Sequence, residues 1–259
     1  MYVDGIGLFG PGMFGWAQAR EVLLGRSQLI LAQVELPPVT ALPAAERRRA
    51  GLPIRLALAT GFAAVEQAHI DPTSLVSVFC STGGDCDNCH QLLETLASDD
   101  RGISPTRFHN SVHNTPAGYW SIATGSMAPS TSLCAYDATF AVGLLEAASQ
   151  AVASGHACLL VAYDTAYPQP LYALRPIPYA MAVGLVLSPV KTSASGALLT
   201  LALTTAAPTR MDDAPLDALS QLIPVARGLP LMQCLAGQRA ASVVIEYLDS
   251  VCLAIEVQW

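Results

Sequence analysis

The segment Pro129–Asp164, PSTSLCAYDATFAVGLLEAASQAVASGHACLLVAYD, carries the pattern that decides the fold. It predicts a short strand at Ser130–Cys134 and a long helix of small residues at Asp137–Ser154, which ends at Gly155. Ala157–Ala162 then follows as a fully apolar strand. A strand without polar residues is typical of a sheet that helices cover on both faces. The segment therefore indicates a strand, a crossover helix and a second, parallel strand.

The chain before this segment shows the same alternation of helices and strands. A strong helix is expected at Ile54–His69 and a buried strand at Ser74–Ser81. The residues Thr82–Gly84 turn this strand into a helix that runs to about Leu96, and a further helix begins near His113. This alternation predicts an α/β fold with a largely parallel sheet.

The remaining segments are less regular. Met1–Gly12 predicts a short strand and a glycine-rich turn, and the prolines of Leu36–Pro53 predict an exposed connection. Ala180–Leu187 and Gly196–Thr204 are rich in β-formers and predict an adjoining hairpin. Ala241–Val257 is compatible with a helix or with strands.

The composition is poor in charge. The chain of 259 residues has 13 Lys and Arg and 20 Asp and Glu, which is 13% charged, whereas about a quarter is usual. The high apolar content excludes a disordered chain, and the net charge of −7 argues against nucleic acid as a partner. Because so few charges cover a large surface, we expect another protein chain to bury part of it.

The sequence predicts a cytoplasmic protein. No apolar run approaches the length of about 18 residues that a membrane span needs. The first residues do not resemble a signal peptide, because Asp4 comes early and no Lys or Arg precedes Arg20. The seven cysteines are therefore expected to be reduced thiols.

Two short motifs suggest cofactors, each in an unfavourable context. Gly5–Gly10, GIGLFG, matches the dinucleotide-binding pattern, but only four residues precede it and Pro11 delays the helix, so a plain glycine turn is favoured. Cys86–His90, CDNCH, matches the haem-attachment pattern and could contribute to a zinc site. No second pair of ligands follows, so cysteines placed by chance on a helix are the favoured reading.

The stretch Ser104–Asn114, SPTRFHNSVHN, places two histidines four residues apart among amides and hydroxyls. His109 and His113 are candidate bases or ligands, since histidine titrates near neutral pH. The alternative, which we favour, is that these polar residues bond to backbone groups and cap the next helix.

The run FHNSVHNTPAGYWSIATG (residues 108–125), together with Pro129–Asp164, resembles the N-terminal half of β-ketoacyl synthases, which have the thiolase-like fold. The resemblance extends over Tyr2–Pro189. Within the family, the sequence is most similar to the short ketosynthase-like subunits of aryl polyene clusters, which are called chain-length factors. It implies a layered αβαβα arrangement, truncated here. It also implies a single domain over residues 1–259, in which residues 190–259 form a reduced C-terminal part.

The resemblance also indicates where a nucleophile would stand. In an active ketosynthase a cysteine at the turn between a short strand and a long helix accepts the acyl chain, and the helix N-terminus favours its thiolate. Counting back from Ala141-Val142-Gly143 places Ala135 at this position and Cys134 one residue before it. No catalytic residue is therefore expected, and Cys134 is the fallback nucleophile.

Condensation also requires two histidines that the family carries in its second half. This chain has no histidine after Pro189, and neither His109 nor His113 matches those positions. The resemblance therefore implies a non-catalytic subunit that pairs with a complete β-ketoacyl synthase as a heterodimer and meets acyl carrier protein through that partner. No cofactor or metal is expected.

In such pairs the partner's acyl tunnel ends against the inactive subunit, where bulky side chains limit the chain length. The residues of this chain that match the interface region are the tunnel and interface candidates Phe108, His109, His113, Tyr119, Trp120, Tyr136 and Phe140. Each aromatic ring among them is at least equally compatible with an ordinary core position.

Two other functions remain open on the sequence alone. The first is an acyltransferase or condensing enzyme in its own right, with Cys134 as nucleophile and His109 or His113 as base. The second is a nucleotide-binding oxidoreductase that uses the glycines of Gly5–Gly10.

Overall fold

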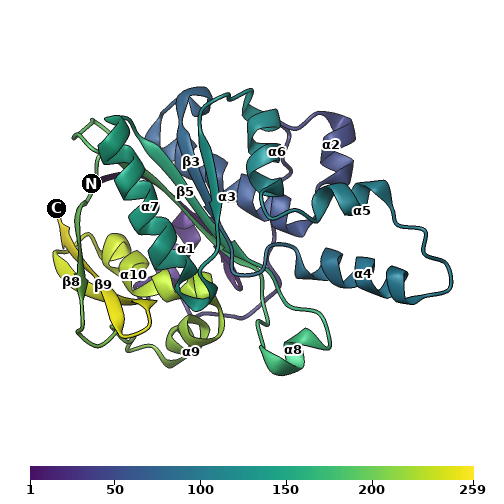
Figure 1. The fold of residues 1–259 in the computed structure, drawn as a ribbon. Helices are drawn as coiled ribbons and strands as arrows, with labels where there is room; N and C mark the ends of the chain where they lie inside the picture. The colour runs from purple at the N-terminus through teal and green to yellow at the C-terminus, as the bar shows by residue number, and fades with distance from the viewer.

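The computed structural model describes residues 1–259 and contains one mixed nine-stranded sheet with helices on both faces (Figure 1). The strand order is β4-β3-β5-β6-β1-β7-β9-β8, and β2 pairs with β1 off this path. The strands are β1 (Tyr2–Gly10), β2 (Met13–Phe14), β3 (Val76–Cys80), β4 (Ser130–Leu133), β5 (Cys158–Asp164), β6 (Met181–Ser188), β7 (Leu198–Thr204), β8 (Ala241–Leu248) and β9 (Val251–Gln258).

Ten α-helices and three short 3-10 helices connect these strands. The α-helices are α1 (Trp16–Leu23), α2 (Ala44–Arg49), α3 (Leu52–Ala68), α4 (Cys86–Ala97), α5 (Pro105–Asn110), α6 (Thr115–Thr124), α7 (Thr139–Ser154), α8 (Leu171–Leu174), α9 (Ala214–Leu222) and α10 (Leu229–Gly237). The 3-10 helices are η1 (Pro72–Ser74), η2 (Tyr136–Ala138) and η3 (Pro224–Gly228). None of the helices is both long and apolar enough to cross a bilayer.

The predicted strand, helix and parallel strand are confirmed as β4, α7 and β5. Both strands pair in parallel with β3, so that Cys80 lies beside Leu133 on one side and beside Ala162 on the other. These are the only parallel pairings, however, and the expectation of a largely parallel sheet was wrong. The chain leaves β5 and returns in β6 at the same end of the sheet, which makes these neighbours antiparallel.

The predicted hairpin between Ala180–Leu187 and Gly196–Thr204 was also wrong. Both segments are strands, β6 and β7, but β1 lies between them. Strand β1 pairs with β6 from Tyr2 to Phe9 and meets β7 only through Tyr2 and Leu198. A partner strand from the other end of the chain leaves no local signal, so the sequence pattern alone favours pairing between the two strands that are consecutive in sequence. Residues 241–257 form a hairpin of their own, β8 and β9.

The first glycines lie inside β1 and do not form a turn. A Cβ atom at Gly5 would stand 2.0 Å from the Ala64 carbonyl oxygen, and one at Gly7 would stand 2.2 Å from that of Thr60. Glycine is needed here because the backbone of α3 packs directly on the strand. The dinucleotide interpretation is therefore excluded, since it requires these glycines between a strand and a helix.

The layers of the fold are defined by the face of the sheet on which each helix packs. Helices α3 and α6 pack on one face of the central strands, and α7 packs on the other face against β3 and β5 (Figure 1). The β7-β9-β8 part of the sheet bends around so that β8 contacts the far side of α7. The chain thus has the successive α, β, α and β layers of the thiolase-like fold. The outer face of the last layer exposes Thr200, Ala202 and Glu256.

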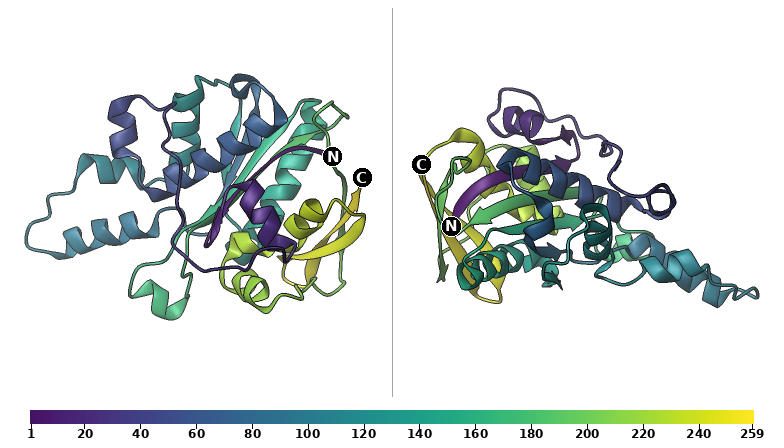
Figure 2. Two further views of the ribbon diagram at one scale, coloured as in Figure 1. Left: turned by 180° about the vertical axis from the view of Figure 1, so that it is seen from behind. Right: turned by 90° about the horizontal axis from the view of Figure 1, so that it is seen from above.

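Helices α4 and α5 extend from one side of the molecule (Figure 2). Along α4 only Asn88 and Leu92 are buried, and Leu93 and Leu96 are exposed. The connection over residues 36–53, expected to be exposed and irregular, contains the short exposed helix α2. The core instead consists of two clusters, one on the α3 and α6 side of the central strands and a larger one on the α7 side that extends to α1, α9, α10, β8 and β9.

Candidate functional site

The junction between β4 and α7 is where the sequence resemblance places the nucleophile position. Strand β4 ends at Leu133, Cys134 and Ala135 follow, and η2 leads into α7. Ala138 is the N-cap residue of α7, so the residue at the start of the long helix is Ala138, whereas counting along the sequence places the nucleophile at Ala135. Neither residue carries a thiol. The helix N-terminus that would favour a thiolate therefore has no thiol to act on.

Cys134 and the two candidate histidines differ in exposure. Cys134 is exposed at the end of β4. His109 is exposed on α5, and His113 is partly buried with Nε2 at 3.1 Å from the Ser81 carbonyl oxygen. This hydrogen bond engages His113 with the turn between β3 and α4, which supports a structural role for its ring.

Other polar residues of the 104–114 stretch also bond to backbone groups. Ser104 caps α5 by accepting from the Arg107 N–H, and the Asn110 side chain donates to the Arg49 carbonyl. The Tyr119 hydroxyl in turn donates to the Asn110 side-chain oxygen at 3.3 Å. The favoured interpretation, in which this stretch satisfies backbone groups, is confirmed for these residues.

A cluster of charged side chains surrounds the β4–α7 junction. The Asp137 carboxylate pairs with the Arg175 guanidinium and, at 3.1 Å, with that of Arg227. Arg227 also pairs with Glu246 of β8, and Arg175 donates to the Thr82 hydroxyl at 3.2 Å. Burial lowers the pKa of Arg227, and the Asp137 carboxylate opposes this shift. The cluster ties the junction to β8, η3 and the turn after β3.

One aromatic ring belongs to this cluster. The Arg175 guanidinium lies over the Tyr136 ring, 3.5 Å from its centroid. Sequence reasoning identified Tyr136 but missed Arg175 and Arg227. These arginines are distant from Asp137 along the chain and stand in no recognisable motif, so only the fold brings them together.

A cavity of about 590 Å³ opens beside the junction. Residues 135–138, the loop over residues 205–208 and residues 246–250 around the turn between β8 and β9 line it, together with Arg227 and Cys252. No group of three or more His, Cys, Asp or Glu side chains is arranged to hold a metal ion. Cys252 of β9 lines the cavity, but no thiol does so from the start of α7. Its charged lining residues are Asp137, Arg227, Glu246 and Asp249.

A buried carboxyl group lies at the end of β5. Asp164 accepts hydrogen bonds from the backbone N–H groups of Thr82 at 2.9 Å and Val225 at 2.8 Å, and from the Ser81 hydroxyl at 3.4 Å. Burial raises the pKa of Asp164 to about 7, against the opposing effect of these donors. The group joins the central sheet to η3 in the C-terminal part.

The five aromatic candidates divide into two groups by exposure. Tyr119, Trp120 and Phe140 are fully buried, whereas Phe108 and Tyr136 are 66% and 65% exposed. The Trp120 ring packs against Phe62 with centroids 4.8 Å apart, and the Phe140 ring packs on Gly228. In the isolated chain only Phe108 and Tyr136 present their rings to a partner.

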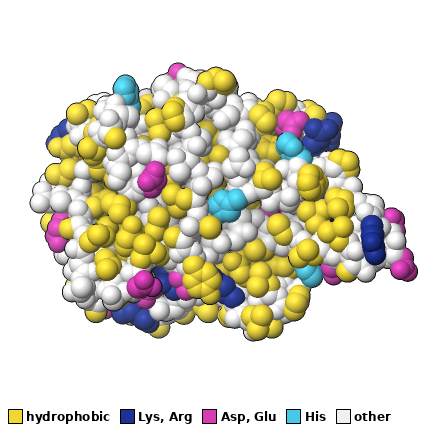
Figure 3. Space-filling model, viewed as in Figure 1, with side chains coloured by type: hydrophobic (Ala, Val, Ile, Leu, Met, Phe, Trp, Pro, Cys, Tyr) yellow, Lys and Arg dark blue, Asp and Glu magenta, His cyan; other side chains and the backbone are white.

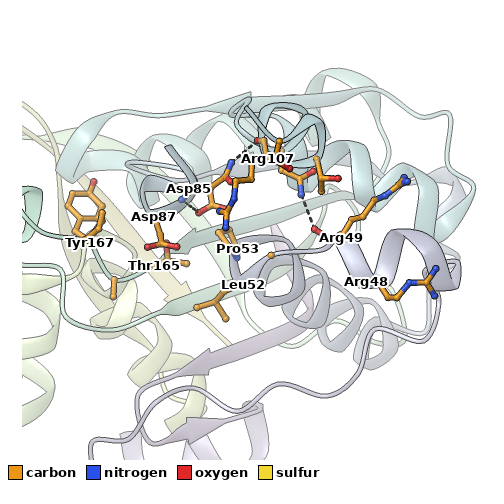
Figure 4. Close-up of a pocket in the computed structure, with 16 residues that line it drawn as sticks. Arg48, Arg49, Leu52, Pro53, Asp85, Asp87, Arg107, Thr165 and Tyr167 are labelled. Carbon is orange, nitrogen blue, oxygen red and sulfur yellow. Dashed lines mark hydrogen bonds between the residues drawn. The ribbon is translucent and has the colours of Figure 1, made fainter. Parts of the chain in front are cut away.

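A second cavity, of about 720 Å³, lies between α2, α4, α5 and the loop after β5 (Figure 4). Arg48, Arg49 and Arg107 line it together with Asp85 and Asp87. Much of this lining is structural. The Asp85 carboxylate caps α4 through the Asn88 N–H, and the Asn88 amide donates to the Arg107 carbonyl.

The CDNCH motif begins α4 beside this cavity. Burial raises the pKa of Cys86 to about 11, and the Cys86 thiol donates to the Gly83 carbonyl. His90 lies 3.3 Å from Glu94, one turn along the same helix. These residues do not converge on a common point, which agrees with the structural interpretation of the motif.

The face that Figure 1 presents carries several patches of hydrophobic side chains (Figure 3). Strand β4 is the first strand of the sheet and pairs only with β3, so its outer edge is open. Helices α6 and α7, which precede and follow β4 in the chain, both lie toward the viewer in Figure 1. Figure 3 shows hydrophobic side chains with few charges across this face. Ile122, Met127 and Val152, from α6, the loop before β4 and α7, are 48%, 95% and 66% exposed.

Solved structures similar to this chain are ketosynthases and their complexes. One is described as "Ketosynthase (ApeO) in Complex with its Chain Length Factor (ApeC) from Xenorhabdus doucetiae", with a TM-score of 0.72, 21% identity and 99% of each chain covered. Another, "The ishigamide ketosynthase/chain length factor", has a TM-score of 0.75 at 12% identity and covers 99% of this chain and 98% of that one. No curated protein sequence matches the chain.

A larger ketosynthase matches only in part. The ketosynthase from module 6 of the bacillaene synthase from Bacillus subtilis 168 has a TM-score of 0.60 at 12% identity, and the match covers 85% of this chain but 44% of that one. The family described as "Beta-ketoacyl synthase, N-terminal domain" matches residues 16–247. This chain therefore belongs to the β-ketoacyl synthase N-terminal domain family, with a thiolase-like fold.

Proposed function

We propose that this chain is a non-catalytic chain-length factor. It pairs with a complete β-ketoacyl synthase, and the pair elongates a polyene acyl chain that acyl carrier protein delivers to the catalytic subunit. The observation that carries this proposal is the absence of a thiol at the start of α7, where the N-cap residue is Ala138 and the matched nucleophile position is Ala135. Two of the similar structures contain a ketosynthase with a chain-length factor, by their descriptions.

The open edge of β4 supports the pairing. An edge strand exposes unpaired backbone N–H and C=O groups, and soluble proteins usually protect such edges with charged side chains. Strand β4, STSL, carries none, and the exposed side chains of Ile122 and Met127 lie on the elements that precede it. A second protein chain that pairs with this edge buries both the backbone groups and the apolar side chains.

The aromatic candidates then have two kinds of role in the pair. Phe108 and Tyr136 stand at the surface and contact the partner or its tunnel directly. Tyr119, Trp120 and Phe140 lie in the core and shape the tunnel end only through the residues packed on them. This division predicts that surface substitutions change product length without a loss of stability.

The proposal is tested with purified subunits. The chain is co-expressed with the complete ketosynthase, and the pair is expected to elute as one complex in gel filtration and to extend an acyl chain on carrier protein with malonyl units. The chain alone is expected to incorporate no malonyl unit. If the chain alone condenses acyl and malonyl thioesters, the proposal is wrong.

A second candidate is an acyltransferase or condensing enzyme that uses Cys134, and the exposure of this thiol at the β4–α7 junction favours it. Incubation with acyl carrier protein followed by mass spectrometry separates the two functions. An acyl adduct on Cys134 that is absent from Cys134→Ser supports the enzyme. An unmodified thiol supports the non-catalytic subunit.

A further inference from the structure

Tyr136 has an unusual backbone conformation for an aromatic residue. Its φ of 53° lies in the left-handed region, which costs about 1–2 kcal/mol for a residue with a side chain. The other residues of this kind with side chains have ordinary explanations. His69 and Gln238 end helices α3 and α10, and Asp249 lies in the turn of the β8–β9 hairpin. Tyr136 instead begins η2, three residues after the end of the edge strand, where no helix ends.

The surroundings hold Tyr136 in this conformation. The Thr139 hydroxyl donates to the Tyr136 carbonyl at 2.7 Å and accepts from the Ala135 N–H at 3.0 Å. The Arg175 guanidinium lies over the ring, and the same guanidinium pairs with the Asp137 carboxylate and donates to the Thr82 hydroxyl. Backbone and ring are therefore both fixed before any partner arrives.

The ring nevertheless remains 65% exposed, while Arg175 is largely buried. Strained backbone that the surrounding structure maintains is concentrated at functional positions. A rigid, exposed tyrosine suits a protein interface, because it contributes a large contact area and loses little rotamer freedom on binding. Phe108 is equally exposed, but no cation–π contact holds its ring, and the one such contact in this structure is at Tyr136.

We infer that Tyr136 is the pre-ordered anchor by which this chain binds the complete ketosynthase, and that Arg175 is the residue that positions it. The inference rests on the proposed function, which assigns that partner to the open edge of β4. Tyr136 follows this edge by three residues, so a chain paired with β4 reaches the ring at the end of the strand. The occupant is the ketosynthase, because the edge of β4 that precedes Tyr136 is open and carries no charged side chain, and a strand of a second protein chain is what such an edge accommodates.

The first test removes the ring and keeps the backbone. Asparagine tolerates the left-handed region, so Tyr136→Asn avoids new strain. The dissociation constant of the complex with the ketosynthase, measured by calorimetry, is expected to rise by about tenfold or more, as for an interface anchor. The melting temperature of the free chain is expected to stay close to that of the wild type. A variant that binds as tightly as the wild type overturns the inference.

The second test separates positioning from a structural role of Arg175. Arg175→Gln removes the guanidinium and is expected to weaken binding several-fold, and Arg175→Lys is expected to restore part of the affinity because it keeps the charge. The double variant Arg175→Gln, Tyr136→Asn is expected to bind no more weakly than Tyr136→Asn alone. If the two effects on the dissociation constant multiply, Arg175 does not act through Tyr136, and the positioning role is wrong.

Control variants distinguish a failure of this inference from a loss of folding and from a failure of the proposed function. Trp259→Asn removes another half-exposed aromatic ring, one that follows β9, the last strand but one at the other end of the sheet, and is expected to leave the affinity unchanged. Melting temperatures of all free variants report any loss of folding. If the wild type does not bind the ketosynthase at all, the proposed function is wrong. If the wild type binds and Tyr136→Asn binds equally, the proposed function stands and only this inference is wrong.

Discussion

The Asp164 carboxylate accepts a hydrogen bond from the Val225 N–H at 2.8 Å, and this contact joins the end of β5 to η3. A second bond, from the Thr82 N–H, joins the same carboxylate to the turn that precedes α4. One buried side chain thus connects the central sheet, the helical extension and the C-terminal part. Its protonation therefore affects how these parts hold together.

Stability is expected to depend on pH through Asp164. Its pKa rises on folding from 3.8 to about 7, so between these values the folded chain keeps a proton that the unfolded chain has released. The free energy of unfolding therefore falls as the pH rises through this range and is flat above it. Asp164→Asn is expected to lose this contribution and about 1–3 kcal/mol of stability, because the amide cannot accept from both N–H groups.

Thermal unfolding of the wild type and of Asp164→Asn between pH 5 and pH 8 checks this expectation, with the pH values chosen to span the raised pKa of about 7. Equal slopes of melting temperature against pH in the two proteins would show that Asp164 is not the responsible group.

The packing of Phe140 on Gly228 predicts a large effect from one methyl group. A Cβ atom at Gly228 would stand 2.6 Å from the Phe140 ring, which is fully buried and cannot move aside. Gly228→Ala is expected to destabilise the fold by about 1–3 kcal/mol through overpacking. Gly118→Ala is the matched control: its Cβ meets no atom within 4 Å on α6, so the variant is expected to gain up to about 1 kcal/mol. Urea unfolding measures both, and equal effects would contradict the packing argument.

A charge on the apolar face is expected to weaken the pair without affecting the fold. Met127 is 95% exposed just before β4, so Met127→Glu keeps the free chain stable. In the complex, the carboxylate is buried without a partner, and the affinity for the ketosynthase is expected to fall about tenfold. Leu203→Glu places the same charge on an exposed position of β7 and is expected to have no effect. Calorimetric titration of both variants decides whether the β4 face carries the interface.

Product length is expected to respond differently to the two phenylalanines. Phe108→Ala removes an exposed ring, so the fold is retained while the products of the assembled pair change in length. Phe140→Ala removes a fully buried ring and is expected to cost about 3–5 kcal/mol of stability. Mass spectrometry of the products, with melting temperatures for each variant, separates the two cases. Unchanged products from Phe108→Ala would remove this residue from the tunnel end.

Local pattern was sufficient for the part of the fold that identifies the family. The apolar run of β5 and the small-residue helix α7 were predicted from Pro129–Asp164, because burial on both faces of a sheet leaves a continuous apolar strand. The position of β1 between β6 and β7 was not predicted. That pairing joins Leu8 to Val183. The local sequence of a strand does not specify which strand, far away in the chain, it pairs with.

The candidate site, like the fold, was predictable from the sequence only in part. The lack of histidine after Pro189, and of cysteine at the start of α7, can be read directly from the order of the residues, since these are questions of which atoms are present. Whether Tyr119, Trp120 and Phe140 face a tunnel or the core was decided only by packing. The cluster of Asp137, Arg175 and Arg227 also exists only in the folded chain. Its members come from three separate segments. The attraction between charges depends on their distance in space, which their separation in sequence does not determine.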